Sequence, residues 1–138
     1  MPITLTLTEG ALPRGAEAQA IARITDAFLA AHQMSGNTVM TPNITAHVNI
    51  MPTGTTFAGG KPVVGAWVET KTPNFALADH AVQTDFFNQA ADVLQELSDG
   101  TLARERIWAN GVHAVDGTWN ISGVTMTNAQ IGEAVSHG

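Results

Sequence analysis

The chain opens with the stretch Met1-Pro2-Ile3-Thr4-Leu5-Thr6-Leu7-Thr8, in which apolar and polar residues alternate. This period of two predicts a strand with one buried and one exposed face. A proline directly after the first methionine is tolerated at the first residue of a strand. If Met1 is removed, Pro2 offers a free secondary amine held at the start of that strand. We therefore interpret the strand as the element that positions this amine.

The composition fits one globular domain, residues 1–138, with few charges. Of the 138 residues, 44% are hydrophobic and 13% are charged, the latter about half the usual share. Twelve acidic and six basic residues give a net charge of -6, which argues against nucleic acid or an anionic membrane as a partner. The lack of cysteine excludes disulfides and thiolate catalysis. No apolar run approaches the ~18 residues of a membrane span and no signal-peptide pattern is present, so we expect a cytoplasmic protein by default.

The first half of the chain predicts a strand, a helix and a second strand. Over about 14–34, apolar residues recur at steps of three and four, which is typical of a helix with one inward face. Ser35-Gly36-Asn37 ends this helix, and residues 42–51 are predicted to form the second strand, closed by a glycine-containing loop over 52–60. The inward stripe of the helix is Ile21, Ile24, Phe28 and Ala31.

The second half repeats this order. Residues 62–68 are nearly all apolar and predict a central strand. A helix is expected over about 75–97 and ends at Ser98-Asp99-Gly100, and residues 104–115 predict the last strand. The inward face of this second helix is Val82, Phe86, Ala90, Val93, Leu94 and Leu97.

Two strand–helix–strand units, 1–60 and 61–124, therefore form an internal duplication in which Pro2 and Pro62 take matching places. Parallel strands joined twice by right-handed helical crossovers predict an α+β fold, a four-stranded sheet with both helices on one face. The polar tail, 125–138, is expected to be a clasp strand or a disordered end.

The other face of such a sheet still carries apolar side chains, and few charges are available to keep it in solvent. We expect another copy of the chain to cover it. Ring closure of such units predicts a homotrimer.

Several segments, in a fixed order behind the Met-Pro start, carry a family resemblance that covers residues 1 to about 124. They are Leu7-Thr8-Glu9-Gly10, Ile44-Thr45-Ala46-His47-Val48, Phe57-Ala58-Gly59-Gly60, Arg106-Ile107-Trp108-Ala109-Asn110 and Gly117-Thr118-Trp119-Asn120. The chain resembles the tautomerase superfamily, the group of 4-oxalocrotonate tautomerase and the macrophage migration inhibitory factor. Its members begin with Met-Pro and are built from duplicated β-α-β units.

The resemblance implies an N-terminal proline that acts in a pocket between neighbouring subunits. Carried over by position, Pro2 is the catalytic amine. Lys71 falls near the place where relatives have a cation for the substrate carboxylate. Trp108 and Asn110 fall where the migration inhibitory factor has an aromatic and an amide residue that line the pocket.

The chain also departs from the family pattern. The arginine that follows Glu-Gly in the muconate tautomerases is Ala11 here, and the second-strand arginine corresponds to about Thr45. Carboxylate binding is therefore not expected to work in the same way. Arg14, three residues after Ala11, is a candidate replacement. Arg106 is a candidate substrate anchor, and its alternative, shared with Arg104, is an ion pair between subunits.

The predicted site consists of the catalytic Pro2 and a set of substrate-binding candidates. The candidates are Lys71, Arg106, Trp108, Asn110, His113, Phe57 and Trp119. Each also has a structural interpretation: a lysine at a strand end is commonly solvated, and a tryptophan commonly packs in a core or interface. No histidine pair has metal-binding spacing, and no glycine loop has the context of a dinucleotide site, so neither metal nor cofactor is expected.

Our first hypothesis for the chemistry is a cofactor-independent tautomerase or isomerase. An α-amino group titrates near ~8, and burial among apolar residues such as Ile3, Phe57 and Trp108 would lower its pKa towards neutrality. Such a base can take a proton from a carbon beside a carbonyl, or from an enol, and return it elsewhere in the conjugated system. Asn110, Lys71 or a backbone N–H would stabilise the enolate.

Two alternatives stay open. If the pocket keeps Pro2 protonated, the same amine is a general acid, suited to a dehalogenase, hydratase or decarboxylase of small unsaturated acids. If Met1 stays attached, the Pro2 nitrogen is an amide and cannot act as a base. The chain would then be a non-catalytic oligomeric binding protein, an interpretation that the missing arginine at Ala11 also favours.

Overall fold

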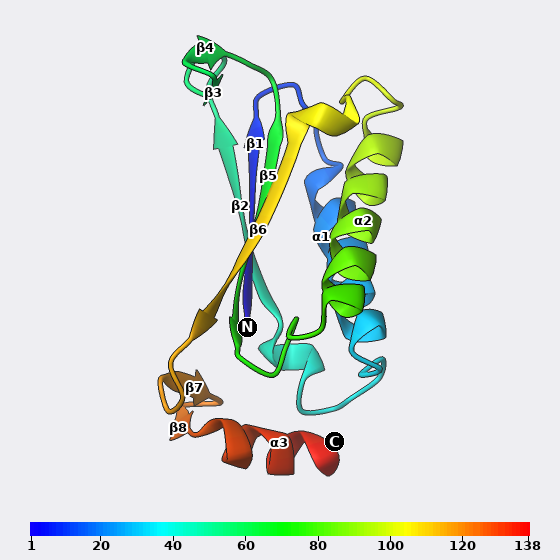
Figure 1. Ribbon diagram of the computed structural model, residues 1–138. Helices are drawn as coiled ribbons and strands as arrows, with labels where there is room; N and C mark the ends of the chain where they lie inside the picture. The colour runs from blue at the N-terminus through cyan, green and yellow to red at the C-terminus, as the bar shows by residue number, and fades with distance from the viewer.

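The computed structural model describes all residues, 1–138, and contains a four-stranded sheet with two long helices on one face (Figure 1). The strand order is β2-β1-β5-β6. Both β1–β2 and β5–β6 are parallel pairs, and the central pair β1–β5 is antiparallel. The strands of the sheet and the two helices that cover it are β1 (Pro2–Thr8), α1 (Glu17–Ala31), β2 (Thr45–Met51), β5 (Ala66–Pro73), α2 (His80–Leu97) and β6 (Ile107–Ala114). The predicted fold of two β-α-β units is confirmed.

Shorter elements decorate the two ends of the sheet. One hairpin, β3–β4, lies at the end where β1 finishes, and the β7–β8 hairpin and helix α3 lie at the end where β1 begins (Figure 1). These elements are η1 (Thr41–Asn43), β3 (Phe57–Ala58), β4 (Lys61–Pro62), η2 (Arg104–Arg106), β7 (Trp119–Ile121), β8 (Val124–Met126) and α3 (Asn128–Ser136). No helix in the structure is long and apolar enough to cross a bilayer.

The core lies between the sheet and the two long helices, as the alternation in β1 predicts. Ile3 and Leu5 are at most 1% exposed, and they face α1 and α2 because side chains alternate along a strand. Phe28 of α1 meets Phe86 of α2 edge to face, with ring centroids 5.2 Å apart. Both helical stripes expected from the sequence are thus confirmed as the inward faces.

The tail beyond residue 124 is neither a lone clasp strand nor disordered. It completes the β7–β8 hairpin and then forms α3. Thr127 and Gln130 cap this helix reciprocally: the Gln130 N–H donates to Thr127 Oγ1, and the Thr127 N–H donates to Gln130 Oε1. This capping box predicts a helix start from sequence, and Ile131, fully buried, anchors the helix.

Most strands and helices begin a few residues later than the sequence predicts. The prediction that Pro2 and Pro62 take matching places in the two units is wrong. Pro62 lies in the β3–β4 hairpin, opposite Phe57, before β5 begins. Pro2, by contrast, is the first residue of β1, whereas β5 begins at Ala66. Arg104, expected in the last strand, instead lies in η2 and forms an ion pair with Asp92 of α2.

Gly65 occupies a place that has no room for a side chain. A Cβ there would lie 2.7 Å from Cζ3 of Trp108 and 2.9 Å from the carbonyl oxygen of Arg106. Trp108 in turn is stacked on Trp67, with ring centroids 5.1 Å apart and planes at 17°. The stack and the glycine therefore depend on each other.

We predict that Gly65→Ala lowers the free energy of unfolding by about 1–3 kcal/mol, because the added methyl group overpacks the stack and a backbone carbonyl. Urea unfolding measures this change. Gly132→Ala is the matched control, since Gly132 in α3 has open space around its Cβ position and alanine favours a helix. Equal unfolding midpoints for Gly65→Ala and the wild-type chain would contradict the prediction.

Candidate functional site

The sheet face that points away from α1 and α2 brings Pro2 together with side chains from β5 and β6. Ile3 lies opposite Thr70, so Pro2 comes opposite Lys71, which itself lies opposite Val112. One row further along, Thr4 is opposite Glu69 and Glu69 is opposite Asn110. These two rows form a pocket of about 250 Å³ lined by Pro2, Thr4, Glu69, Thr70, Lys71, Asn110 and Val112. We call it the Pro2 pocket.

The two charged residues of the Pro2 pocket are not neutralised by the chain itself. Glu69 and Lys71 are exposed, and the ion pairs of the structure are those of Arg23 with Glu96 and Arg104 with Asp92. The Lys71 ammonium is therefore available to an anionic group, and the Asn110 amide can donate a hydrogen bond beside it. The pocket presents one cation, one carboxylate and one amide to a ligand.

Of the residues that the sequence singled out, Pro2, Lys71 and Asn110 line this pocket. Trp108 lies on the same face, two residues before Asn110, but it is stacked on Trp67 rather than in the pocket wall. Trp119 lies in β7, at the end of the sheet where Pro2 begins, and does not line the pocket either.

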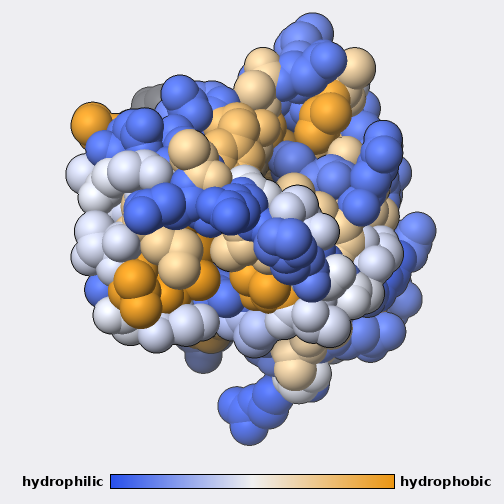
Figure 2. Space-filling model, turned by 90° about the horizontal axis from the view of Figure 1, so that it is seen from below, coloured by the Kyte–Doolittle hydropathy of each residue, from blue (hydrophilic) through white to orange (hydrophobic).

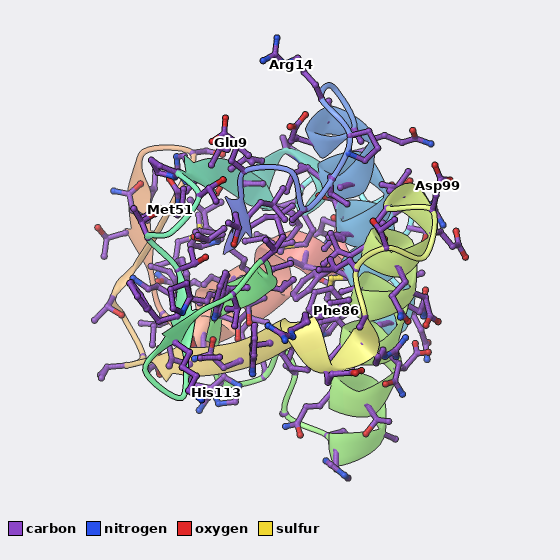
Figure 3. All side chains as sticks on the ribbon, turned by 90° about the horizontal axis from the view of Figure 1, so that it is seen from above. Glu9, Arg14, Met51, Phe86, Asp99 and His113 are labelled. Atoms are coloured by element: carbon purple, nitrogen blue, oxygen red, sulfur yellow. The ribbon has the colours of Figure 1, made fainter.

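Phe57 and Arg106 lie at the opposite end of the sheet, in the β3–β4 hairpin and in η2 (Figure 1). Arg14 projects outward from the loop before α1 (Figure 3). His113 is on the helix-facing side of β6, where its Nε2–H donates to the Ala76 carbonyl at 2.9 Å. Within one chain, these four side chains are therefore separate from Pro2.

Sequence reasoning missed four residues of the pocket wall, namely Thr4, Glu69, Thr70 and Val112. A signal existed for three of them. Side chains two apart on a strand share a face, so Thr4 follows from Pro2, Glu69 from Lys71, and Val112 from Asn110. What the sequence lacked was the register that sets these strands side by side.

Met1 is part of the core, with 7% of its surface exposed. Its carbonyl accepts a hydrogen bond from the Thr45 N–H at 3.2 Å, and its amino group donates to the Asn43 carbonyl. Burial lowers the pKa of this amino group from its ordinary value of 8.0 to about 6. While Met1 is attached, the Pro2 nitrogen belongs to a peptide bond and is not basic.

The end of the molecule around the N-terminus is also where α3 and the β7–β8 hairpin lie. Seen from this end, hydrophobic patches alternate with hydrophilic side chains (Figure 2). The exposed apolar residues in β6, β8 and the segment between them include Val112, Val115 and Val124. This end of the molecule is therefore partly apolar.

The fold defines a class of protein, one with two β-α-β units joined by an antiparallel central strand pair. No protein-family model matches the sequence, and no curated protein matches it. Solved structures do match. A fused 4-OT, described as a symmetric trimer, has a TM-score of 0.75 at 7% identity, covering 96% of this chain and 99% of that one.

Two further structures are similar over the same length. N1, a member of the cis-3-chloroacrylic acid dehalogenase family, has a TM-score of 0.72 at 12% identity over 96% of this chain and 90% of that one. Pt0534 inactivated by 2-oxo-3-pentynoate has a TM-score of 0.74 at 12% identity, covering 96% and 99%. The chain therefore has the fold of the tautomerase superfamily, as the sequence resemblance predicted.

We predict that a chain retaining Met1 loses stability as the pH falls from 8 to 6. The amino group has a pKa near 8.0 when unfolded and about 6 when folded, so the unfolded state binds more protons across this window and stability rises with pH. Urea midpoints at several pH values measure this slope. The control is the same chain acetylated at Met1, which lacks the titrating group; identical pH slopes in the two chains would contradict the prediction.

Proposed function

We propose that this chain, after removal of Met1, is a cofactor-independent tautomerase or isomerase with the Pro2 amine as its general base. The observation that carries the proposal is that Pro2, Lys71 and Asn110 line one pocket. An amine, a cation and an amide donor are the groups that proton transfer beside a carbonyl requires. The tautomerase fold of the chain is consistent with this chemistry.

The burial of the N-terminus supports a role for the Pro2 amine as a base. Desolvation already brings the pKa of the neighbouring Met1 amino group to about 6. The Pro2 amine, exposed by removal of Met1, would lie between the space that Met1 fills and the Pro2 pocket, and partial burial would lower its pKa in the same direction. An amine that is neutral near pH 7 can accept a proton from a carbon acid.

The charges of the pocket support a small acid as the substrate. Lys71 would hold the substrate carboxylate, and the Asn110 amide would donate to the oxygen on which enolate charge develops. A cavity of about 150 Å³ accommodates benzene, so a pocket of about 250 Å³ fits a small keto acid or its enol.

A second candidate function is favoured by Glu69. Its carboxylate lies in the same pocket as Pro2, and a nearby negative charge favours the protonated amine. Protonated Pro2 would then act as a general acid in a dehalogenase, hydratase or decarboxylase of small unsaturated acids. One structural neighbour belongs to a dehalogenase family.

We also infer that the chain assembles as a homotrimer. Neighbours of the same fold are described as symmetric and asymmetric trimers. The sheet face that carries the Pro2 pocket and the Trp67–Trp108 stack has no covering layer within the chain. Trimer assembly would cover this face, and the mass of the native particle in solution measures it.

We predict that Pro2→Ala, in a chain without Met1, lowers turnover of an enol such as phenylenolpyruvate by about 10²–10⁴-fold, the usual share of a general base. Intact-mass measurement first establishes that Met1 is absent. Pro13→Ala, at an exposed proline of the loop before α1, is the matched control and should keep wild-type turnover. Wild-type activity in Pro2→Ala would end the proposal.

The pH dependence separates the two mechanisms. With Pro2 as base, kcat/KM rises as the pH increases through the Pro2 pKa, because the neutral amine is the active form. With Pro2 as acid, kcat/KM falls over the same range. Profiles measured on an enol and on a haloacrylate decide between the two, and no turnover of either would favour the non-catalytic binding protein.

We predict that Lys71→Met raises KM for a carboxylate substrate about tenfold, because it removes the only cation of the pocket wall. The KM for the methyl ester of the same substrate should change little in this variant, since the ester has no negative charge for Lys71 to bind. Arg23→Met removes a cation from α1, outside the pocket, and serves as the control. Equal losses for acid and ester would show that Lys71 does not bind the carboxylate.

A further inference from the structure

The segment 74–79 joins the end of β5 to the start of α2 (Figure 1). We call it the strap. Its Leu77 is 4% exposed and belongs to the hydrophobic core. The same residue forms part of the wall of a pocket of about 240 Å³, which lies on the helix-facing side of β5 and β6. The bonds that hold the strap therefore also close this end of the core.

The peptide unit between Ala76 and Leu77 is bound by a histidine on each side. Its carbonyl accepts a hydrogen bond from His113 Nε2 of β6 at 2.9 Å. Its N–H donates to Nε2 of His32, the residue that ends α1, also at 2.9 Å. A carbonyl only accepts and a peptide N–H only donates, so Nε2 carries a hydrogen in His113 and a lone pair in His32. We call these two bonds the histidine clamp.

A further bond of His32 determines where the hydrogen of its ring lies. His32 Nδ1 is 2.8 Å from the Phe28 carbonyl oxygen, which can only accept, so the hydrogen is on Nδ1. The neutral ring in this tautomer makes both bonds. A protonated ring carries a hydrogen on each nitrogen, and its Nε2–H would then point at the Leu77 N–H. Protonation of His32 therefore breaks its bond to the strap and keeps its bond to Phe28.

The two sides of the histidine clamp respond differently to acid. The Ala76 carbonyl also accepts from Thr72 Oγ1 at 3.3 Å, and a protonated His113 still donates from Nε2. The Leu77 N–H has no acceptor other than His32 Nε2. Acid therefore acts on the strap through His32.

Leu77 is also held in an uncommon backbone conformation. Its φ is 53°, a left-handed value that is costly for a residue with a branched side chain. Such a conformation persists only where its surroundings hold it. The bonds that do so are the one to His32 and a second one, in which the Leu77 carbonyl accepts from Gln83 Nε2 at 2.7 Å. Loss of the first bond allows the residue to relax and its side chain to leave the core.

No opposite charge compensates for a proton on His32. The ion pairs of the structure include neither His32 nor His113. The titratable groups on the elements around the clamp have other hydrogen-bond partners (the Met1 amino group, Asp79, His80, Asp116) or are exposed (Asp26, Asp85, Glu133, His137). The charged ring would therefore face the Leu77 N–H without a carboxylate beside it.

We propose that the strap is a pH-sensitive closure, shut while His32 is neutral and released when the His32 ring takes up a proton. Because histidine ordinarily titrates near ~6.5, mild acid is enough to protonate it. Release frees Leu77 from the core. It also loosens the strap's contact with α3, in which Asn128 Nδ2 donates to Asn74 Oδ1 at 2.7 Å. The proposal does not depend on the chemistry assigned to Pro2.

The test is amide hydrogen exchange of the intact chain, followed by NMR at about pH 7.5 and about pH 5, on either side of the ordinary histidine pKa. Each rate is expressed as a protection factor, relative to an unstructured peptide at the same pH. We expect the protection factor of the Leu77 amide to fall about tenfold or more on acidification, because its hydrogen bond is lost. The Ile24 amide, in the middle of α1, should keep its protection and so exclude global unfolding.

Two variants assign the effect to one ring. His32→Gln replaces the ring by an uncharged amide that can still accept from the Leu77 N–H, so the Leu77 protection factor should no longer depend on pH. His113→Gln is the matched control, which removes the other ring of the clamp and should keep the pH dependence of the wild type. The Met1 amino group, with a pKa of about 6, is common to all three chains and cannot cause a difference between them.

A measurement on the wild-type chain needs no variant to fold. The ¹⁵N chemical shifts of the ring nitrogens at about pH 7.5 identify the tautomer of a neutral histidine, and we expect the hydrogen on Nδ1 in His32. A hydrogen on Nε2 of His32 would overturn the proposal. So would equal Leu77 protection at the two pH values, the wild-type acid response in His32→Gln, or its loss in His113→Gln.

Discussion

The antiparallel pairing of β1 with β5 is the constraint on which the rest of the structure depends. It joins two β-α-β units that each form a parallel pair, and it places Leu5 opposite Val68 at the middle of the core. Register in such a pair is strongly specified, because a slip of one residue would turn the buried row of β1 towards solvent. The same register brings Pro2 opposite Lys71 on the other face. Hydrophobic burial on one face of the sheet thus fixes the geometry of a polar pocket on the other face.

The sheet carries a pocket on each of its two faces. Asn110 belongs to the Pro2 pocket, and the next residue, Gly111, belongs to the pocket on the helix side. Glycine is needed where no Cβ fits: at Gly65 the stacked tryptophan excludes it, and at Gly111 the hydroxyl of Thr70 would lie 2.8 Å away. The two glycines therefore serve opposite purposes, one accommodating a packed aromatic pair and the other opening a pocket.

The proposed chemistry requires cleavage of one covalent bond, the peptide bond between Met1 and Pro2. With the bond intact, Met1 fills part of the core and the Pro2 nitrogen carries no lone pair suitable for accepting a proton. With the bond cleaved, the same site offers a secondary amine in partly dry surroundings, next to Lys71 and Asn110. Burial of Met1 lowers the pKa of its amino group to about 6.

The sequence by itself determined the elements, their order and their inward faces, because periods of two and of three to four residues record which side of each element is buried. The family resemblance predicted a site around Pro2, Lys71 and Asn110, which line one pocket. The sequence could not place Pro62, Arg106, Phe57 or His113 relative to Pro2, since distance along the chain says nothing of which strand end or sheet face a side chain occupies. It also missed α3, although the capping box of Thr127 and Gln130 was visible. Only the tertiary structure decided the pockets, because strand register, settled by packing between residues far apart in the chain, sets Glu69 and Thr4 beside Pro2 and leaves Thr70 unpaired behind Gly111.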